Sequence, residues 1–107
     1  LTENPRTAVF DEIDTGIGGR VAEAVGIKLR ELSKNYQVLC VTHQPQVASL
    51  ADHHFFVEKE AVKNRTKVSI RELNKDEKVE EIARMLTGAE ITETARKHAK
   101  EMLKAAK

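Results

Sequence analysis

The most informative stretch of the chain is Thr7-Ala8-Val9-Phe10-Asp11-Glu12, an apolar run that ends in two adjacent carboxylates. The glycine-rich segment Gly16-Ile17-Gly18-Gly19 follows it. Such a strand can present a metal-linked acid beside an acid that activates water. In an open α/β sheet, ligands bind at the carboxyl ends of the strands. The run therefore predicts half of a site for phosphate chemistry.

A second strand is expected over residues 36–42, and it ends in His43. This run is nearly all apolar, as is typical of a strand covered on both faces in a parallel sheet. Between the two strands, a helix is predicted from about Arg20 to Ser33. One apolar stripe recurs along it with the 3.6-residue period, and consists of Val21, Val25, Leu29 and Leu32. Strand, helix and strand together indicate a βαβ unit with a right-handed crossover.

The rest of the chain predicts short elements. Pro45 favours the start of a short helix over about 45–51. Two strands and two helices should follow, over residues 54–59, 66–72, 76–86 and from about 92 onward, with Ala61–Arg65 as the turn between the strands. Apolar and polar residues alternate in the second of these strands, which indicates that one face is exposed to solvent. Gly88 is a natural helix C-cap. The expected fold class is α/β: a partial parallel sheet with flanking helices and a small β-hairpin.

Length and composition indicate one small globular domain. The chain has 107 residues, of which 40% are hydrophobic and 33% charged. No apolar stretch approaches the roughly 20 residues that a membrane helix needs, and no signal peptide is visible. The first residue is not Met, which suggests an excised or cleaved piece. The single cysteine, Cys40, cannot form an internal disulfide, and we interpret it as a reduced core thiol of a cytosolic protein.

Charge is distributed unevenly along the chain. Residues 1–60 carry 6 Lys/Arg against 9 Asp/Glu, whereas residues 61–107 carry 12 against 8. The basic half ends in a cluster that comprises Arg96, Lys97, Lys100, Lys104 and Lys107. Such a run can contact a nucleic-acid backbone. More often it is the solvated face of a terminal helix.

Three residues carry the expected chemistry. Asp11 would hold Mg²⁺, through a water molecule, because Mg²⁺ dehydrates reluctantly. Glu12 would polarise or deprotonate the attacking water. His43 could donate a hydrogen bond to a γ-phosphate oxygen. The alternative is that the acids only terminate a strand at the surface and that His43 is an ordinary surface or cap residue.

Two other patterns have less support. His53 and His54 follow Asp52 and suggest a metal site, but adjacent residues of a strand point to opposite faces, and no further ligand spacing supports chelation. The glycine-rich turn is not a dinucleotide-binding fingerprint, because Val21 occupies the third glycine position. No G-x-x-x-x-G-K-[ST] loop occurs in the sequence, so this chain should not bind ATP tightly by itself.

Several segments together resemble the RecN family of bacterial DNA repair proteins, relatives of the SMC proteins and of the ABC-type ATPases. The resemblance rests mainly on residues 9–19 (VFDEIDTGIGG) and 41–48 (VTHQPQVA), with weaker support from 56–59, 73–75 and 82–88. ABC-type ATPases usually continue to an Ala-Leu-Asp ending after the acidic pair. Here that last acid would fall near Gly18, so the chain departs from their pattern.

The resemblance implies that residues 1–107 form the carboxyl-terminal lobe of a P-loop NTPase-like (ABC/SMC) head, without the lobe that carries Walker A. Asp11 and Glu12 would be the Walker B pair and His43 the switch histidine. Of these, Glu12 and His43 would be the catalytic residues. Asp11, Asp14 and Gly18 would take part in nucleotide binding, with Asp11 as the Mg²⁺ residue.

The implied activity is ATP hydrolysis coupled to head dimerisation in DNA double-strand-break repair and recombination, with ATP and Mg²⁺ as cofactors. The implied partners are the amino-terminal lobe of the same protein, a second head in a homodimer, and DNA through the full-length protein. No membrane is expected, and the implied location is the cytoplasm at the nucleoid. Two alternatives stay open: an ABC-type transporter fragment, and a non-catalytic module that binds DNA or a protein.

Overall fold

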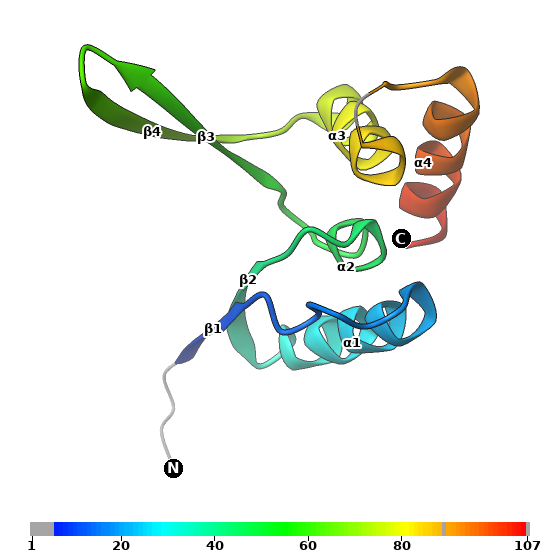
Figure 1. Cartoon of the computed structure of the whole chain (residues 1–107). Coiled ribbons are helices and arrows are strands. Elements are labelled where there is room, and N and C mark those ends of the chain that lie inside the picture. Colours follow the sequence, from blue (N-terminus) through cyan, green and yellow to red (C-terminus); the bar gives the residue numbers. More distant parts are fainter. Residues whose placement is uncertain (1–5, 89, 107) are drawn as a thin grey trace.

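A computed structural model describes residues 6–88 and 90–106 of the chain (Figure 1). The elements run in the order β1 (Arg6–Asp11), α1 (Gly19–Leu32), β2 (Tyr36–Val41), α2 (Pro45–Ala48), β3 (Phe55–Val62), β4 (Arg65–Glu72), α3 (Lys75–Thr87) and α4 (Glu93–Ala105). This order and these element types confirm the sequence-based prediction, although several ends differ.

The two strands of the predicted βαβ unit are direct neighbours. β1 and β2 pair in parallel, with Arg6 opposite Tyr36 and Asp11 opposite Val41. Helix α1 makes the crossover and packs against β2. Because parallel strands end at the same edge, the residues that follow Asp11 and Val41 start from adjacent points.

Coverage of this sheet differs from the prediction. Alternate residues on one face, Ala8, Phe10, Val38 and Cys40, are half-buried. On the other face Val9, Leu39 and Val41 are 65%, 48% and 56% exposed. The expectation that the second strand is covered on both faces is therefore wrong for the described residues. An apolar face remains accessible.

Small residues determine how α1 packs. Its buried residues are Ala22 and Gly26, whereas Val21 of the predicted stripe is exposed. A Cβ added to Gly26 would lie 2.6 Å from Leu50 Cδ1, and one added to Gly19 would lie 2.9 Å from Gln46 Nε2. The absence of these side chains lets α2 and the turn after it approach α1 closely, and this contact moves the buried stripe away from Val21.

Helices α3 and α4 lie side by side and form the main core (Figure 1). Its buried residues are Ala48, Ile82, Ala83, Ala95 and Ala99, and half-buried apolar side chains surround them. The predicted apolar side of the last helix is thus confirmed. Its buried alanines, Ala95 and Ala99, belong to the same cluster as Ile82 of α3.

The helix ends have the expected chemistry. The Glu77 N–H donates to the Asn74 side chain (2.9 Å), and the Asn74 N–H donates to the Glu77 carboxylate (3.0 Å), which makes a capping box. This box starts α3 at Lys75, one residue before the predicted start. Gly88 lies at a φ of 85° and ends α3, as predicted.

The hairpin β3–β4 projects from the helices (Figure 1). Its strands pair from Phe55–Glu72 to Val62–Arg65, so the turn is only Lys63-Asn64 and is shorter than predicted. Both turn residues have positive φ, 47° and 62°, as a type I′ hairpin turn requires.

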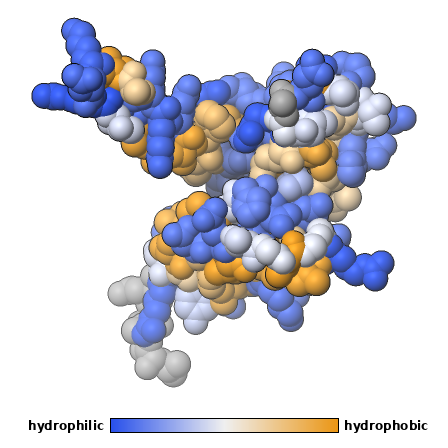
Figure 2. Space-filling model, viewed as in Figure 1, coloured by the Kyte–Doolittle hydropathy of each residue, from blue (hydrophilic) through white to orange (hydrophobic). Residues whose placement is uncertain are grey.

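The two faces of the hairpin differ in polarity. Cross-strand partners share a face, so the register groups the exposed apolar residues Phe55, Val57, Val68 and Ile70 on one of them. Every residue of β4 is exposed, so neither face of this strand is buried, whereas the sequence predicted only one wet face. Figure 2 shows hydrophobic residues at the surface in the hairpin region and near β1 and β2.

Candidate nucleotide site at the ends of β1 and β2

The acidic pair and His43 lie at the same edge of the sheet. Asp11 is the last residue of β1, and His43 comes two residues after the end of β2. The Glu12 N–H donates to the Val41 carbonyl at 2.8 Å, which extends the strand pairing by one residue. The expectation that Asp11 and His43 share the carboxyl edge of neighbouring parallel strands is confirmed.

Glu12 and His43 approach each other at this edge. Glu12 Oε1 lies 3.9 Å from His43 Nδ1, and the two side chains are 56% and 59% exposed. This distance is too long for a hydrogen bond. Both side chains are therefore available to a bound molecule while they remain close to each other. Asp11 is also exposed.

The backbone at Glu12 has an unusual conformation. Its φ is 50°, in the left-handed region that non-glycine residues rarely adopt. Holding a residue there costs on the order of 1–3 kcal/mol. Two hydrogen bonds keep it in place: its N–H donates to Val41, and its carbonyl accepts from the Thr15 N–H at 3.2 Å. No feature of the sequence predicted this conformation.

Asp14 occupies a different environment from the other acids. It is 0% exposed, and its Oδ2 accepts a hydrogen bond from the Thr42 hydroxyl. Its Oδ1 is buried and has no hydrogen-bond partner among the described residues. The Asp14 side chain is therefore shielded from solvent in the described structure, and its expected part in nucleotide binding stays a prediction.

Gln44 joins the two loops at a second point. Its Nε2 donates to the carbonyls of Asp14 (3.4 Å) and Ile17 (3.1 Å), and its backbone N–H donates to Thr42 Oγ1 (3.0 Å). Sequence reasoning missed Thr42 and Gln44. The available signal was that two hydrogen-bonding residues flank His43 just after an apolar strand.

Gly18 and Gly16 shape the loop between β1 and α1. Gly18 is the N-cap of α1, and its carbonyl accepts the Ala22 N–H at 2.9 Å. Gly16 has a φ of 80°, which confirms the tight turn predicted for this glycine-rich segment. Gly18 is exposed, and a Cβ added to it would have no atom within 4 Å. A ligand can therefore approach its backbone closely.

Curated proteins named "DNA repair protein RecN" match nearly the whole chain. The protein from Halalkalibacterium halodurans is 50% identical over 97 residues, which are 91% of this chain. The protein from Bacillus subtilis is 50% identical over 92% of the chain, and that from Rickettsia felis 53% over 89%. The chain belongs to the RecN family. It spans only 17% of the length of each of these three relatives.

A solved structure has a fold similar to that of this chain. The chain matches it with a TM-score of 0.59 and 17% sequence identity, over 82% of this chain and 52% of the other. That structure is described under "Structural biochemistry of ATP-driven dimerization and DNA stimulated activation of SMC ATPases". This RecN-family chain thus shares the α/β fold of that SMC ATPase structure. No protein-family model matches the sequence.

Other titratable residues of this RecN-family chain have different surroundings. His53 Nδ1 lies 2.7 Å from Glu72 Oε2, whereas burial lowers the pKa of the half-buried His54. Burial raises the pKa of the Cys40 thiol, and the charge of Asp14 adds to this effect. Within residues 6–88 and 90–106, no group of three or more His, Cys, Asp or Glu residues is placed to hold a metal ion.

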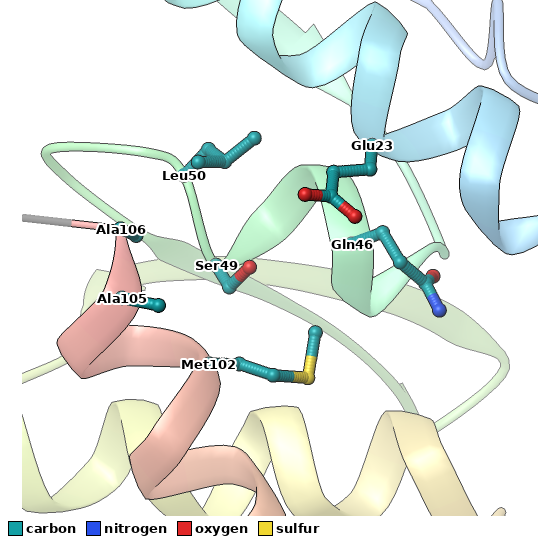
Figure 3. Close-up of a pocket in the computed structure, with 7 residues that line it drawn as sticks. All are labelled: Glu23, Gln46, Ser49, Leu50, Met102, Ala105 and Ala106. Carbon is teal, nitrogen blue, oxygen red and sulfur yellow. The ribbon is translucent and has the colours of Figure 1, made fainter.

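A cavity of about 160 Å³ lies between α1, α2 and α4 (Figure 3). Its lining includes Glu23 from α1, Gln46 from α2 and Met102 from α4. None of Asp11, Glu12 and His43 lines it. Its volume is below the roughly 300–1,000 Å³ of ordinary ligand pockets, so the sheet edge is the better candidate site. In the described part of the chain, no helix is long and apolar enough to cross a membrane.

Proposed function

We propose that this chain is the part of an SMC-like ATPase head that supplies the water-activating acid and the switch histidine, in a protein that acts in DNA double-strand-break repair and recombination. The observation that carries the proposal is the 3.9 Å approach of Glu12 and His43 at the ends of two parallel strands. The name of the matching relatives, "DNA repair protein RecN", supports the biological setting.

In this proposal each residue has one role in ATP hydrolysis. Glu12 accepts a proton from the attacking water, for which a general base must lie within hydrogen-bond reach. His43 donates to an oxygen of the γ-phosphate, and the backbone at Gly18 lies close to the nucleotide. Asp11 holds Mg²⁺ through water. When bound, this ion would neutralise charge that develops on the phosphates.

The described residues suit a magnesium ion of this kind. Mg²⁺ is usually bound by one or two carboxylates together with substrate phosphates, and it keeps several waters. Asp11 offers one exposed carboxylate at the strand end. No cage of three or more ligands occurs in the part of the chain that the structure describes, so the nucleotide itself would have to complete the coordination.

The remaining parts of the site would come from other segments. The sequence lacks a G-x-x-x-x-G-K-[ST] loop, so residues 1–107 would act as the carboxyl-terminal lobe and the amino-terminal lobe of the same protein would bind the phosphates. The exposed apolar face of β1 and β2 supports this proposal, because another segment could pack against it. A second head in a homodimer and DNA are the further proposed partners, and the proposed location is the cytoplasm at the nucleoid.

The alternatives have less support. None of the three relatives described above is named as a transporter. A non-catalytic module would use the basic residues of α4. One of these, Arg96, already pairs with Glu80 and Glu93 at 2.7 Å each. Lys97, Lys100 and Lys104 are exposed, so contact of this helix with DNA or a protein would depend on them.

The test is Glu12→Gln in the full-length protein. The amide keeps the size of the side chain and removes its basicity, so ATP should still bind while the hydrolysis rate falls about 10²–10⁴-fold. Steady-state phosphate release measures the rate, and equilibrium nucleotide titration measures binding. Glu60→Gln, at an exposed position of β3, is the matched control and should hydrolyse ATP normally.

Two further results test the proposed roles of Glu12 and Asp11. Wild-type turnover in the Glu12→Gln variant would remove Glu12 from the mechanism and favour the non-catalytic module. Asp11→Asn should instead weaken binding of the nucleotide in the presence of Mg²⁺, with a smaller effect in its absence.

A further inference from the structure

Two loops carry the proposed catalytic side chains, and a small polar network joins them. The loop after β1 carries Glu12, and the loop after β2 carries His43. Three residues make the connection: Asp14 from the first loop, and Thr42 and Gln44 from the second. We name these three residues the clasp.

The hydrogen bonds of the clasp are mutually consistent. A threonine hydroxyl has one proton to donate and two lone pairs. Thr42 donates to Asp14 Oδ2 and accepts from the Gln44 N–H. The Gln44 amide has two protons, and these reach the carbonyls of Asp14 and Ile17. Each donor therefore has its acceptor, and the network leaves little freedom for either loop to move alone.

The clasp residues are placed next to the catalytic positions. Thr42 and Gln44 flank His43 on both sides in the sequence, and Asp14 follows Glu12 by two residues. The Glu12 N–H already holds the Val41 carbonyl. The two loops are thus joined both before and after the acidic and imidazole side chains.

Burial shields Asp14 from ligands in solvent and strengthens its hydrogen bond with Thr42. The residue is 0% exposed, in contrast to the exposed Asp11 and Glu12. A buried carboxylate interacts strongly with its hydrogen-bond donors because the local dielectric is low. Its Oδ1 has no partner among the described residues. Asp14 therefore depends on Thr42 in the described structure, and loss of the hydroxyl would leave the carboxylate without a side-chain donor.

We propose that Asp14, Thr42 and Gln44 act as a clasp that positions Glu12 against His43, and that Asp14 is a positioning residue for hydrolysis and makes no direct contact with the nucleotide. This inference rests on the proposed ATPase function. It predicts that the clasp affects the rate of the chemical step and leaves nucleotide affinity nearly unchanged, because misplacing a catalytic group by about 1 Å can cost about 10²-fold in rate.

The experiment compares Thr42→Val, Thr42→Ser and Asp14→Asn in the full-length protein. Valine keeps the shape of threonine without the hydroxyl, and serine keeps the hydroxyl. We expect Thr42→Val and Asp14→Asn to lower kcat about 10- to 100-fold, with KM for ATP within about twofold of wild type. Thr42→Ser should restore most of kcat. The double variant Thr42→Val/Asp14→Asn should lose little more than the worse single variant, since one substitution removes and the other weakens the same contact.

Matched controls remove a similar group elsewhere. Thr94→Val removes an exposed hydroxyl of α4, and Asp52→Asn changes an exposed carboxylate before β3. Both should retain wild-type kcat and KM. Circular dichroism and thermal unfolding of each variant report on the fold.

Several results would overturn the clasp. Wild-type kcat in both Thr42→Val and Asp14→Asn would do so, and so would a raised KM with unchanged kcat, which would make Asp14 a nucleotide ligand. Unfolding of both variants would show that the Thr42–Asp14 contact only stabilises the fold. Glu12→Gln separates this failure from failure of the proposed function: if Glu12→Gln stops hydrolysis but the clasp variants do not, only the clasp is wrong.

Discussion

At the residue scale, Glu12 combines a strained backbone with an accessible carboxylate. Its φ of 50° places it outside the regions favoured by non-glycine residues. Such strain persists only where neighbouring contacts hold it, and Val41 and Thr15 provide them here. The left-handed residue ends the strand immediately after Asp11. The two acids therefore leave the strand in different backbone conformations, which suits the two separate roles proposed for them.

A second residue predicts how stability depends on pH. Burial lowers the pKa of His54, Glu81 opposes this shift, and Lys78 adds to it. In the unfolded chain the pKa returns to about 6.5. Above that value the ring is neutral in both states and has no effect. As the pH falls below it, the unfolded chain takes up the proton first, so the free energy of unfolding should fall until the folded pKa is reached.

Urea unfolding of the isolated chain at about pH 7.5 and about pH 5.5 measures this loss. Replacement His54→Gln should reduce the difference between the two conditions, because the titrating group is removed. Replacement His98→Gln, at an exposed position of α4, should leave the difference as it is in wild type. An unchanged pH dependence in His54→Gln would show that other groups cause the effect.

At the element scale, helix α3 depends on its first turn. The Asn74 side chain accepts from the Glu77 N–H, and the Glu77 side chain accepts from the Asn74 N–H. Replacement Asn74→Ala should lower the free energy of unfolding by about 1 kcal/mol, the usual value of an N-cap side chain. Asn74→Asp keeps an acceptor and should retain most of the stability. Equal losses in both variants, measured by urea unfolding, would contradict the capping role.

The sequence predicts the elements well because their signals are local. Apolar runs placed both strands of the βαβ unit, and Gly88 marked the end of α3. Asp11, Glu12 and His43 could be placed at one edge because parallel strands end together. The burial of Asp14 could not be predicted, since Thr42 is 28 residues away and the loops meet only after the sheet forms. The exposure of Val21 could not be predicted for the same reason. It follows from the packing of α2 against Gly26, which buries a different side of α1.

At the scale of the whole molecule, apolar surface is distributed over two separate sheets. Val9, Leu39 and Val41 are exposed on the parallel pair, and Val57 and Ile70 on the hairpin. The core of α3 and α4 lies apart from both (Figure 1). Monomeric soluble proteins rarely leave large contiguous apolar patches uncovered. The chain spans 17% of the length of the Halalkalibacterium halodurans relative, and the function proposed above would place the amino-terminal lobe against such a face.

The proposed function leads to a prediction for the isolated chain. The 107 residues contain no phosphate-binding G-x-x-x-x-G-K-[ST] loop, so they should release no phosphate from ATP above background. Co-expression with the proposed amino-terminal lobe as a separate polypeptide should restore turnover, because in the proposed function that lobe supplies the contacts to the phosphates. The same mixture made with the Glu12→Gln chain should bind ATP and remain slow. Turnover by the isolated chain that disappears in its Glu12→Gln variant would contradict this prediction, because a contaminating ATPase would be insensitive to that substitution.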